Sequence, residues 1–433
     1  MRIFSLIFVV FFFLVSLALL PSVMTGGSVT FFIFQADALA VFMALVSSLV
    51  GSIIVLYSFD YISHYSHQNE YYLMVMLFLG SMMGLIYSRH LIALYVFWEL
   101  TAIASWRLIG FYRKDWDVMR ADKAFLITLF GAAMMLLGFL GIYQMTGSWE
   151  LTGMIGKVLP APLVALILFG ILSKSATLPF HTWLPDAGVA PSPVTALLHA
   201  AVLVKIGVYV FARLFLTTFI IGHFWHVAVP ALAAISALVA GGAALIETDI
   251  KRIIAYSTVS QIAFIFLGLA SGNMIGAVGG LLFILMHGLS KAGLFLCAGI
   301  IEQNTHEKDI TKMGGLIKTM PVTAVSFLFC AFSVMGLPPF GGFFSKYMVI
   351  AGAVNAGERY IALAFILGAV LTILYLLRLF NLIFLGENRG AHGREGSKLM
   401  IFCVALLAFL SLAGGLLVNY PLEFLNTAVR FIR

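Results

Sequence analysis

Charged residues are scarce in this chain. Only 10% of its 433 residues are Asp, Glu, Lys or Arg, whereas a soluble globular chain carries about 25%. Hydrophobic residues make up 62% of the sequence, in uninterrupted runs of about 20 residues, the length at which a helix crosses a bilayer. The alternating segments of about 10 residues that mark a membrane β-barrel are missing. We therefore expect an all-α integral membrane protein that forms one transmembrane domain.

Cysteine is almost as rare, and no cofactor motif accompanies it. Cys297, Cys330 and Cys403 all lie inside apolar runs and lack the spacing of metal ligands. No dinucleotide-binding glycine fingerprint is present either. We expect no metal and no cofactor on this chain, which argues against a redox enzyme in its own right. The net charge of +7 does not indicate nucleic acid as a partner, because most basic residues lie in short loops between apolar runs.

The apolar runs predict thirteen membrane spans. Two are interrupted, the sixth by Pro179 and the eleventh by Pro338 and Pro339 within a glycine-rich segment. Proline lacks the amide donor that a helix interior needs, so we expect two broken helices. The predicted spans are 3–21, 37–58, 72–88, 89–112, 122–144, 161–180, 191–217, 225–246, 253–271, 274–301, 320–356, 360–385 and 399–420.

The basic residues outside the spans predict an orientation. Thirteen of them fall on the side of the N-terminus and six on the opposite side. The positive-inside rule then places the N-terminus in the cytoplasm and the C-terminus outside, with a prokaryotic inner membrane as the expected location. The two broken helices lie five spans apart and so enter from opposite sides, as in two inverted five-helix repeats, spans 3–7 and 8–12. The expected parts are two N-terminal peripheral helices (1–71), the two repeats (72–217 and 225–385), and a C-terminal helix with its tail (399–433).

Charges inside the spans are the candidate functional residues. A charged side chain at the bilayer centre costs at least about 2.5–3.5 kcal/mol, so each must face the bundle interior or water. Arg378, near the end of its span, is interpreted as reaching the headgroups, and Arg107 as a structural charge facing a partner subunit. The remaining charged residues predict an ion path, and they are Glu99, Lys174, Lys205, Lys291 and Lys346.

Two histidines are candidate relays beside these lysines, because imidazole titrates near neutrality. His199 and Lys205 are six residues apart and are expected on opposite sides of one helix, whereas His287 and Lys291, four apart, share a face. Lysine suits proton transfer, since burial disfavours its charged form and a nearby carboxylate favours it. A carboxylate that moves, such as Glu99, therefore switches a buried lysine between holding and releasing a proton.

Several stretches resemble a known family. They are SKSATLPFHTWLPDA at 173–187, PSPVTALLHAA at 191–201, WEL at 98–100, DIKRIIAYSTVSQ at 249–261, HGLSKA at 287–292 and GLPPFGGFFSK at 336–346. Over about residues 35–390 the chain is similar to the antiporter-like subunits of respiratory complex I, of multi-subunit Na⁺/H⁺ antiporters and of membrane-bound hydrogenase-type complexes.

The resemblance implies proton translocation through two linked half-channels. Glu99 and Lys174 correspond to the switching pair, Lys291 to the central relay and Lys346 to the exit relay. The stretch around Lys205 is similar to the corresponding stretch in the antiporter and hydrogenase branches of the family. The expected partners are other membrane subunits, with a peripheral iron–sulfur redox arm in a redox-driven complex. We expect departures from the family's pattern, among them the lack of one helix that relatives carry at the start, and Arg107 at a position expected to be apolar.

The expected function is translocation of protons, or of sodium against protons, within a multi-subunit redox-driven or antiporter complex. One alternative is a scaffold subunit that transports nothing, although such a subunit has no reason to bear the insertion cost of the retained charges. Another is a partner subunit of an inorganic-anion uptake system. The sequence does not decide between proton and sodium, nor does it identify the complex.

Overall fold

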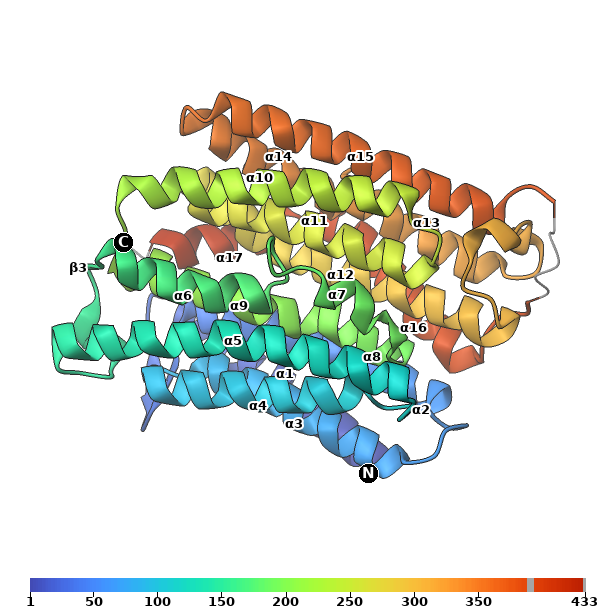
Figure 1. The fold of residues 1–433 in the computed structure, drawn as a ribbon, viewed down its shortest axis with the longest axis horizontal. Coiled ribbons are helices and arrows are strands. Elements are labelled where there is room, and N and C mark those ends of the chain that lie inside the picture. The colour runs from blue at the N-terminus through green and yellow to red at the C-terminus, as the bar shows by residue number, and fades with distance from the viewer. Residues whose placement is uncertain (388–392, 431–433) are drawn as a thin grey trace.

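The computed structural model describes residues 1–387 and 393–430. Arg389 and Arg433, which both enter the charge count above, lie outside the described residues. The long helices run roughly along the longest axis of the molecule (Figure 1). One end of the bundle, here the N-terminal face, carries residues 62–67, 110–114, 247–249 and 306–320. The opposite end, the C-terminal face, carries residues 25–37, 147–160, 217–222 and 271–273.

The chain begins with two long helices, α1 (Arg2–Met24) and α2 (Ala38–Tyr61), joined by a hairpin of β1 (Val29–Phe31) and β2 (Phe34–Ala36). Asp37 caps α2, because its carboxylate accepts a hydrogen bond from the Ala40 amide. Helix α1 lies on the outside of the bundle and exposes a row of large apolar side chains. Helix α2, grouped above with α1 as peripheral, is buried along most of its length and packs against α12 and α16. It therefore belongs to the core.

The next five passes form one unit. They are α3 (Gln68–Tyr87), α4 (Leu91–Ile109), α5 (Asp115–Thr146), the broken pass α6 (Ala161–Lys174) with α7 (Trp183–Asp186), and a composite pass of α8 (Ser192–Ala196), η3 (Leu197–Ala201), α9 (Leu203–Phe211) and η4 (Ala212–Leu216). Segments η3 and η4 are π-helical, whereas the short η1 (Leu151–Met154) and η2 (Ala187–Val189) are 3₁₀. Strands β3 (Lys157–Val158) and β4 (Phe219–Ile220) pair in parallel at the C-terminal face.

The second unit repeats the pattern and is followed by two more helices. It contains α10 (His223–Ile246), α11 (Ile250–Ala270), α12 (Met274–Thr305), the broken pass α13 (Pro321–Met335) with α14 (Gly341–Asn355), and α15 (Arg359–Phe384). Two 3₁₀ turns, η5 (Ile310–Lys312) and η6 (Leu316–Lys318), precede α13. Helix α16 (Lys398–Leu416) completes the spans, and the segment expected as a tail forms a further helix, α17 (Asn419–Arg430).

The structure confirms the all-α membrane fold and the predicted positions of the spans. Among the described residues, eleven helices are long and apolar enough to cross a membrane, counting Ser192–Leu216 as one. The remaining two predicted spans are the broken passes, whose apolar first halves, α6 and α13, are shorter. Helix α6 runs inward from the C-terminal face and α13 inward from the N-terminal face. Their opposite directions are those expected of an inverted pair.

Both breaks have the same local pattern. Helix α6 ends at Lys174 and α13 at Met335, and a left-handed residue follows each end, Ala176 (φ 50°) and Gly336 (φ 83°). A proline stands three residues after each left-handed residue, Pro179 and Pro339. The left-handed conformation terminates a helix, so the first break begins before the proline that predicted it.

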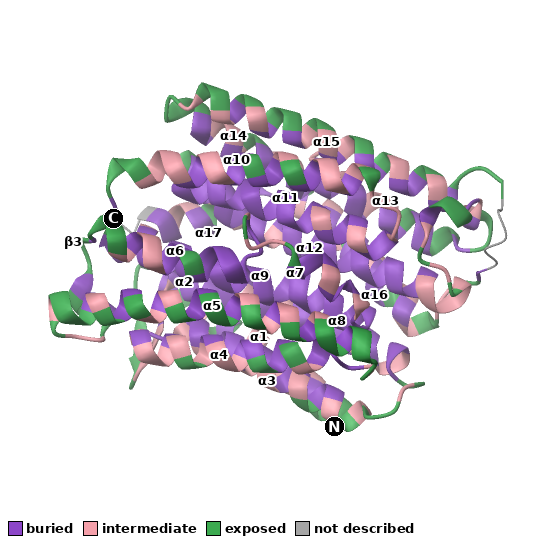
Figure 2. Cartoon of the chain, in the orientation of Figure 1, coloured by how far each residue is buried: buried purple, intermediate pink, exposed green. Residues whose placement is uncertain are grey.

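Burial divides the helices into an interior and a lipid-facing shell. Helices α9, α11 and α12 are buried along almost their whole lengths (Figure 2). Exposed large apolar side chains concentrate on α1, α5 and α15. Since lipid chains are as apolar as these side chains, the outer surface needs no further cover. The interior of the bundle is therefore where α9, α11 and α12 meet, between the two broken passes.

Candidate functional site

The first candidate residues lie between α4 and α6. Lys174, the last residue of α6, is fully buried. Its ammonium donates a hydrogen bond of 3.1 Å to the Trp98 carbonyl and lies 5.2 Å from the centre of the Trp98 ring. Helix α4 thus provides both a carbonyl acceptor and an aromatic face for the charge.

Glu99 follows Trp98 on α4 but does not close an ion pair with Lys174 in the described part of the chain. Its Oε1 atom is buried and has no hydrogen-bond partner among the described residues, while Tyr95 lies one turn earlier and interacts with the carboxyl group. The predicted switching pair is therefore adjacent in the structure, with the lysine held by the backbone beside the glutamate.

The two five-pass units meet at Lys205. Its amine shares a hydrogen bond of 2.5 Å with Nδ1 of His287 on α12 and donates one of 3.2 Å to the carbonyl of His199. The ring of His199 packs on Phe295, also on α12, with 4.4 Å between ring centres. His199 and Lys205 therefore face the same neighbouring helix, and their predicted placement on opposite sides is wrong. The cause is the π-helical segment η3 followed by the irregular residue Val202, which changes the turn between them.

Lys291 lies one turn after His287 and is directed toward α11. Its ammonium donates to the Ile254 carbonyl at 3.0 Å and to the hydroxyl of Ser257. Fully buried, it depends on these two acceptors for hydrogen bonding. Histidine and lysine on one turn of α12 thus connect α9 on one side with α11 on the other.

Lys346 ends the line of charges at the second break. It is 4% exposed, and its ammonium lies 4.6 Å from the ring centre of Phe264 and 6.0 Å from that of Phe283. Nζ has no hydrogen-bond partner within the described residues. The side chain crosses Gly336, where an added Cβ would meet its Cδ atom at 2.9 Å, so the break requires glycine both for its positive φ and for this contact. Water access to Lys346 stays a prediction, since aromatic rings surround the ammonium.

Three groups of charge pairs have no counterpart among the sequence predictions. Arg107, interpreted as facing a partner, pairs with Glu70 on α3, which also binds Arg113 at 2.6 Å. Arg252 and Lys123 both bind Asp186 at 2.7 Å beside the first break. At the N-terminal face, Glu302 binds Lys308 on one side and Lys251 on the other.

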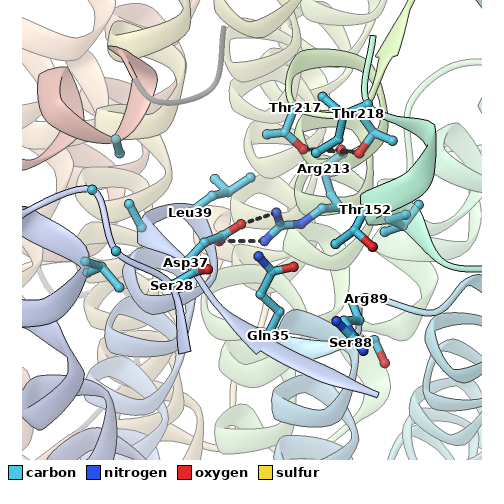
Figure 3. Close-up of a pocket in the computed structure, with 17 residues that line it drawn as sticks. Ser28, Gln35, Asp37, Leu39, Ser88, Arg89, Thr152, Arg213, Thr217 and Thr218 are labelled. Carbon is cyan, nitrogen blue, oxygen red and sulfur yellow. Dashed lines mark hydrogen bonds and ion pairs between the residues drawn. The ribbon is translucent and has the colours of Figure 1, made fainter. Parts of the chain in front are cut away.

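A further pair lies at the C-terminal face. Asp37 accepts two hydrogen bonds from the Arg213 guanidinium, at 2.5 and 2.8 Å, on the wall of a cavity of about 320 Å³ (Figure 3). Arg213 also donates to the hydroxyl of Tyr209, one turn earlier. Burial alone would raise the pKa of Asp37, but the charge and hydrogen bonds of Arg213 outweigh it and hold that pKa below its ordinary value of 3.8. In the sequence, the sign that could have pointed to this pair is Arg213. It follows Lys205 by eight residues and therefore lies on the same face of a helix.

The arrangement is suited to proton movement. No group of three or more His, Cys, Asp or Glu side chains that would hold a metal ion occurs in residues 1–387 and 393–430. The central residues instead form a series of titratable side chains on α4, α6, α9, α12 and α14, all of them buried except the partly buried Glu99. Each of them touches a backbone carbonyl, a hydroxyl, an imidazole or an aromatic face, which are groups that stabilise a proton during transfer.

Sequence comparison identifies relatives of the whole membrane domain. The profile of the family described as "NADH:quinone oxidoreductase/Mrp antiporter, TM" matches residues 88–372, which include all five charged candidates. The chain is 36% identical over 421 residues to a Na⁺/H⁺ antiporter subunit from Alkalihalophilus pseudofirmus, covering 88% of this chain and 52% of that protein. It is 35% identical over 409 residues to NADH-quinone oxidoreductase subunit L from Campylobacter jejuni, covering 92% and 68%. The chain thus spans about half the length of the antiporter protein.

Solved structures share the fold over nearly the full length. A chain of the Mrp complex from Dietzia sp. DQ12-45-1b superposes with a TM-score of 0.92 at 24% identity, covering 98% of this chain and 91% of that one. A chain of the membrane-bound sulfane sulfur reductase, an archaeal respiratory membrane complex, also gives 0.92 at 24% identity, with coverages of 100% and 92%. At this identity the likeness concerns the fold.

Proposed function

The chain belongs to the NADH:quinone oxidoreductase/Mrp antiporter family of membrane subunits, and we propose that it carries protons, or exchanges sodium ions for protons, across the membrane as one subunit of a larger complex. The path runs through Glu99, Lys174, Lys205, Lys291 and Lys346, with His199 and His287 as relays. The chain is oriented with its N-terminus in the cytoplasm and its C-terminus outside, as its loop charges favour.

One observation carries this proposal, namely the 2.5 Å hydrogen bond between Lys205 and His287. It joins α9 of the first five-pass unit to α12 of the second, so the two units share a continuous titratable contact in the middle of the protein. A scaffold needs no such contact, because apolar packing would join the same helices without burying a lysine. A proton accepted by the imidazole on one ring nitrogen is matched by one released from the other, which lets His287 transfer charge without changing its own protonation.

The Glu99–Lys174 pair supplies the switch. With the glutamate withdrawn, the lysine is held by a carbonyl and an indole ring only. When a carboxylate approaches to about 4 Å, the attraction of a unit charge pair is about 4 kcal/mol at an effective dielectric constant of about 20. That corresponds to a change of about a thousandfold in how strongly the lysine holds its proton. Opening and closing the pair therefore loads and unloads the first site of the path.

A neighbouring membrane subunit covers the flank of α4 that bears Glu99. The residue is only partly buried here, and Val96, Ile103 and Trp106 on the same helix are 50%, 46% and 37% exposed. A carboxylate in mid-span facing lipid would carry the full insertion cost. A partner subunit on this flank removes that cost and keeps water at the glutamate. The same contact would let the partner control the switch.

Loss of Lys174 tests the proposal. The complex would be purified with its natural subunits, reconstituted into vesicles, and assayed for proton flux with a pH-sensitive dye. We expect Lys174→Ala to lower the flux at least about a hundredfold, because a positioned proton-transfer group contributes about 10²–10⁴ in rate. Lys157→Ala, at an exposed lysine of β3, is the matched control and should transport normally. A Lys174→Ala complex that assembles and transports at the rate of the control would support the scaffold alternative.

A further inference from the structure

A carboxylate outside this path connects the interior with the N-terminal face. Glu302, in the last turn of α12, binds Lys308 at 3.0 Å on one side and Lys251 at 2.5 Å on the other. The side chains become steadily more buried along this series, at 45%, 19% and 2% exposed for Lys308, Glu302 and Lys251. Lys251 also donates to the Ala190 carbonyl at 3.1 Å. The three residues thus lead from the surface of the protein to its interior.

Part of this arrangement is structural. Lys251 stands in the first turn of α11, where a positive charge opposes the helix dipole. A buried lysine in that position needs a counter-charge, and Glu302 supplies it. A counter-charge alone, however, does not account for the tyrosine hydroxyls that line the neighbouring part of α12.

Tyrosines in the last turns of α2 and in the segment after it form a file that packs against α12. Tyr57, Tyr61 and Tyr65 are spaced four residues apart, with 5.8 and 6.3 Å between successive ring centres. The Tyr57 hydroxyl and Oγ of Ser192 both lie against Gly299, one turn before Glu302 on α12, where an added Cβ would meet each oxygen at 2.9 Å. Tyr65 lines a cavity of about 680 Å³ at the N-terminal face, together with Gln303, the residue after Glu302. The file therefore starts at a surface cavity and runs along α12.

The inner end of the file contacts the composite pass that carries the predicted relay His199. The Tyr61 hydroxyl donates to Oγ of Ser192 at 3.4 Å, and Ser192 precedes His199 by seven residues on the same composite pass. The Tyr57 hydroxyl donates to the Leu296 carbonyl at 2.9 Å, next to Phe295, on which the His199 ring packs. Both ring nitrogens of His199 are buried without a hydrogen-bond partner in the part of the chain that the structure describes. The imidazole is thus free to accept a proton.

We propose that Glu302 is a further residue of the ion path, through which protons pass between the cavity at the N-terminal face and His199. The inference rests on the proposed function. A proton from water in the cavity binds the carboxylate, which becomes a neutral acid. The acid then gives a proton to the Tyr61 oxygen while that hydroxyl releases its own toward Ser192, and a ring nitrogen of His199 accepts the last one. One proton arrives and one is delivered, and Glu302 returns to its carboxylate form.

Other charged and titratable groups act on this carboxylate. They come from α11 and the residue before it, from the loop after α12, from α2 and from the segment after α4, and they are Lys251, Asp249, Lys308, Tyr57, Tyr61 and Tyr112. Lys251 and Lys308 each place a positive charge against Glu302. They set the charge of the site, and the hydroxyls provide the route.

Glu302→Gln is the first test, in the same whole complex and vesicle assay. We expect proton flux to fall at least about tenfold, since glutamine cannot release a proton. The double variant Glu302→Gln with Lys251→Met separates relay from counter-charge, because it removes the unpaired buried lysine as well. If Glu302 is a relay, the double variant regains thermal stability but not flux. Recovery of flux in the double variant would overturn the proposal, and so would normal flux in Glu302→Gln.

Tyr61→Phe tests the route without disturbing the ion pair. The ring stacking is kept and only the hydroxyl is lost, so the complex should assemble normally while the flux drops several-fold. Tyr72→Phe is the matched control, a buried tyrosine on α3 whose hydroxyl donates to the Ser58 carbonyl. Equal flux in the two variants would refute the hydroxyl route. If the Glu302 and Tyr61 variants transport normally while Lys174→Ala does not, the inference fails and the proposed function stands; normal transport in Lys174→Ala refutes the function itself.

Discussion

Replacing Asp37 gives the sharpest test of how the buried charges are held. The Asp37→Ala change removes the two carboxylate oxygens that accept from Arg213, whose side chain is 10% exposed, and the cap on the Ala40 amide. A buried charge left without its partner costs about 3–5 kcal/mol, and a lost helix cap costs about 1 kcal/mol. Arg213 keeps its hydrogen bonds to Tyr209, which favours the lower part of that range. We expect the free energy of unfolding to fall by about 4 kcal/mol.

Asp37→Asn separates the charge from the cap. Asparagine still accepts from the Ala40 amide and still faces Arg213, so only the negative charge of the acceptor is lost. We expect the free energy of unfolding to fall by about 2–3 kcal/mol. The control is Glu150→Gln, at the other arginine–carboxylate pair of this face. Nη2 of Arg89 lies 3.6 Å from Oε1 of Glu150, and the glutamate side chain is 49% exposed. The expected loss of unfolding free energy is therefore about 0–1 kcal/mol. Unfolding by denaturant titration in mild detergent measures all three variants. Equal costs for Asp37→Asn and Glu150→Gln would refute the reasoning.

The same pair has a pH signature. Because the pKa of Asp37 is lower in the folded protein than its ordinary value of 3.8, the unfolded chain takes up the proton first as the pH falls. The stability that the charge provides is therefore fully present above about pH 5 and is lost as the pH falls below 3.8 toward the folded value. The difference in unfolding free energy between wild type and Asp37→Asn should stay constant from about pH 5 to 8 and shrink below about pH 4. A difference that is unchanged at about pH 3 would contradict the assignment.

Two further predictions concern the second break and the topology. Lys346→Glu should retain part of the proton flux, since a buried carboxyl group also relays protons. Lys346→Met should lose nearly all of the flux with no loss of thermal stability. Equal flux in the two variants would make Lys346 a structural charge. Single cysteines introduced within residues 303–318 should react with an impermeant thiol reagent from the cytoplasmic side, and cysteines after Pro421 from the outside. The background should be low because the three native cysteines are buried. Labelling of both segments from one side would refute an odd number of spans.

Much of the fold could be predicted from the sequence, because hydropathy is local information. The tenth span, expected over 274–301, is α12 (Met274–Thr305), and proline marked both broken passes. Local geometry within the spans escaped prediction. Helix α6 ends at Lys174 because Ala176 adopts a left-handed conformation, and η3 turns with a π-helical pitch. Neither has a signal in the pattern of apolar residues.

The candidate site, too, could be predicted from the sequence only in part. A charge inside an apolar run is conspicuous, so the central lysines could be named from their cost in the membrane. Their partners could not, because the pairing depends on contacts between distant segments: 82 residues separate Lys205 from His287, and 176 separate Arg213 from Asp37. Glu302 escaped notice because it ends a span and there resembles a loop residue.

The coupling between Glu99 and Lys174 tests the central claim most directly. Proton flux would be measured in vesicles that contain the complex with Glu99→Gln, with Lys174→Ala, and with both changes. Residues that act as one switch are non-additive, so each single variant should lose at least about a hundredfold in flux. The double variant should lose little more than the worse single variant. Losses that multiply in the double variant, or wild-type flux in either single variant, would contradict the account.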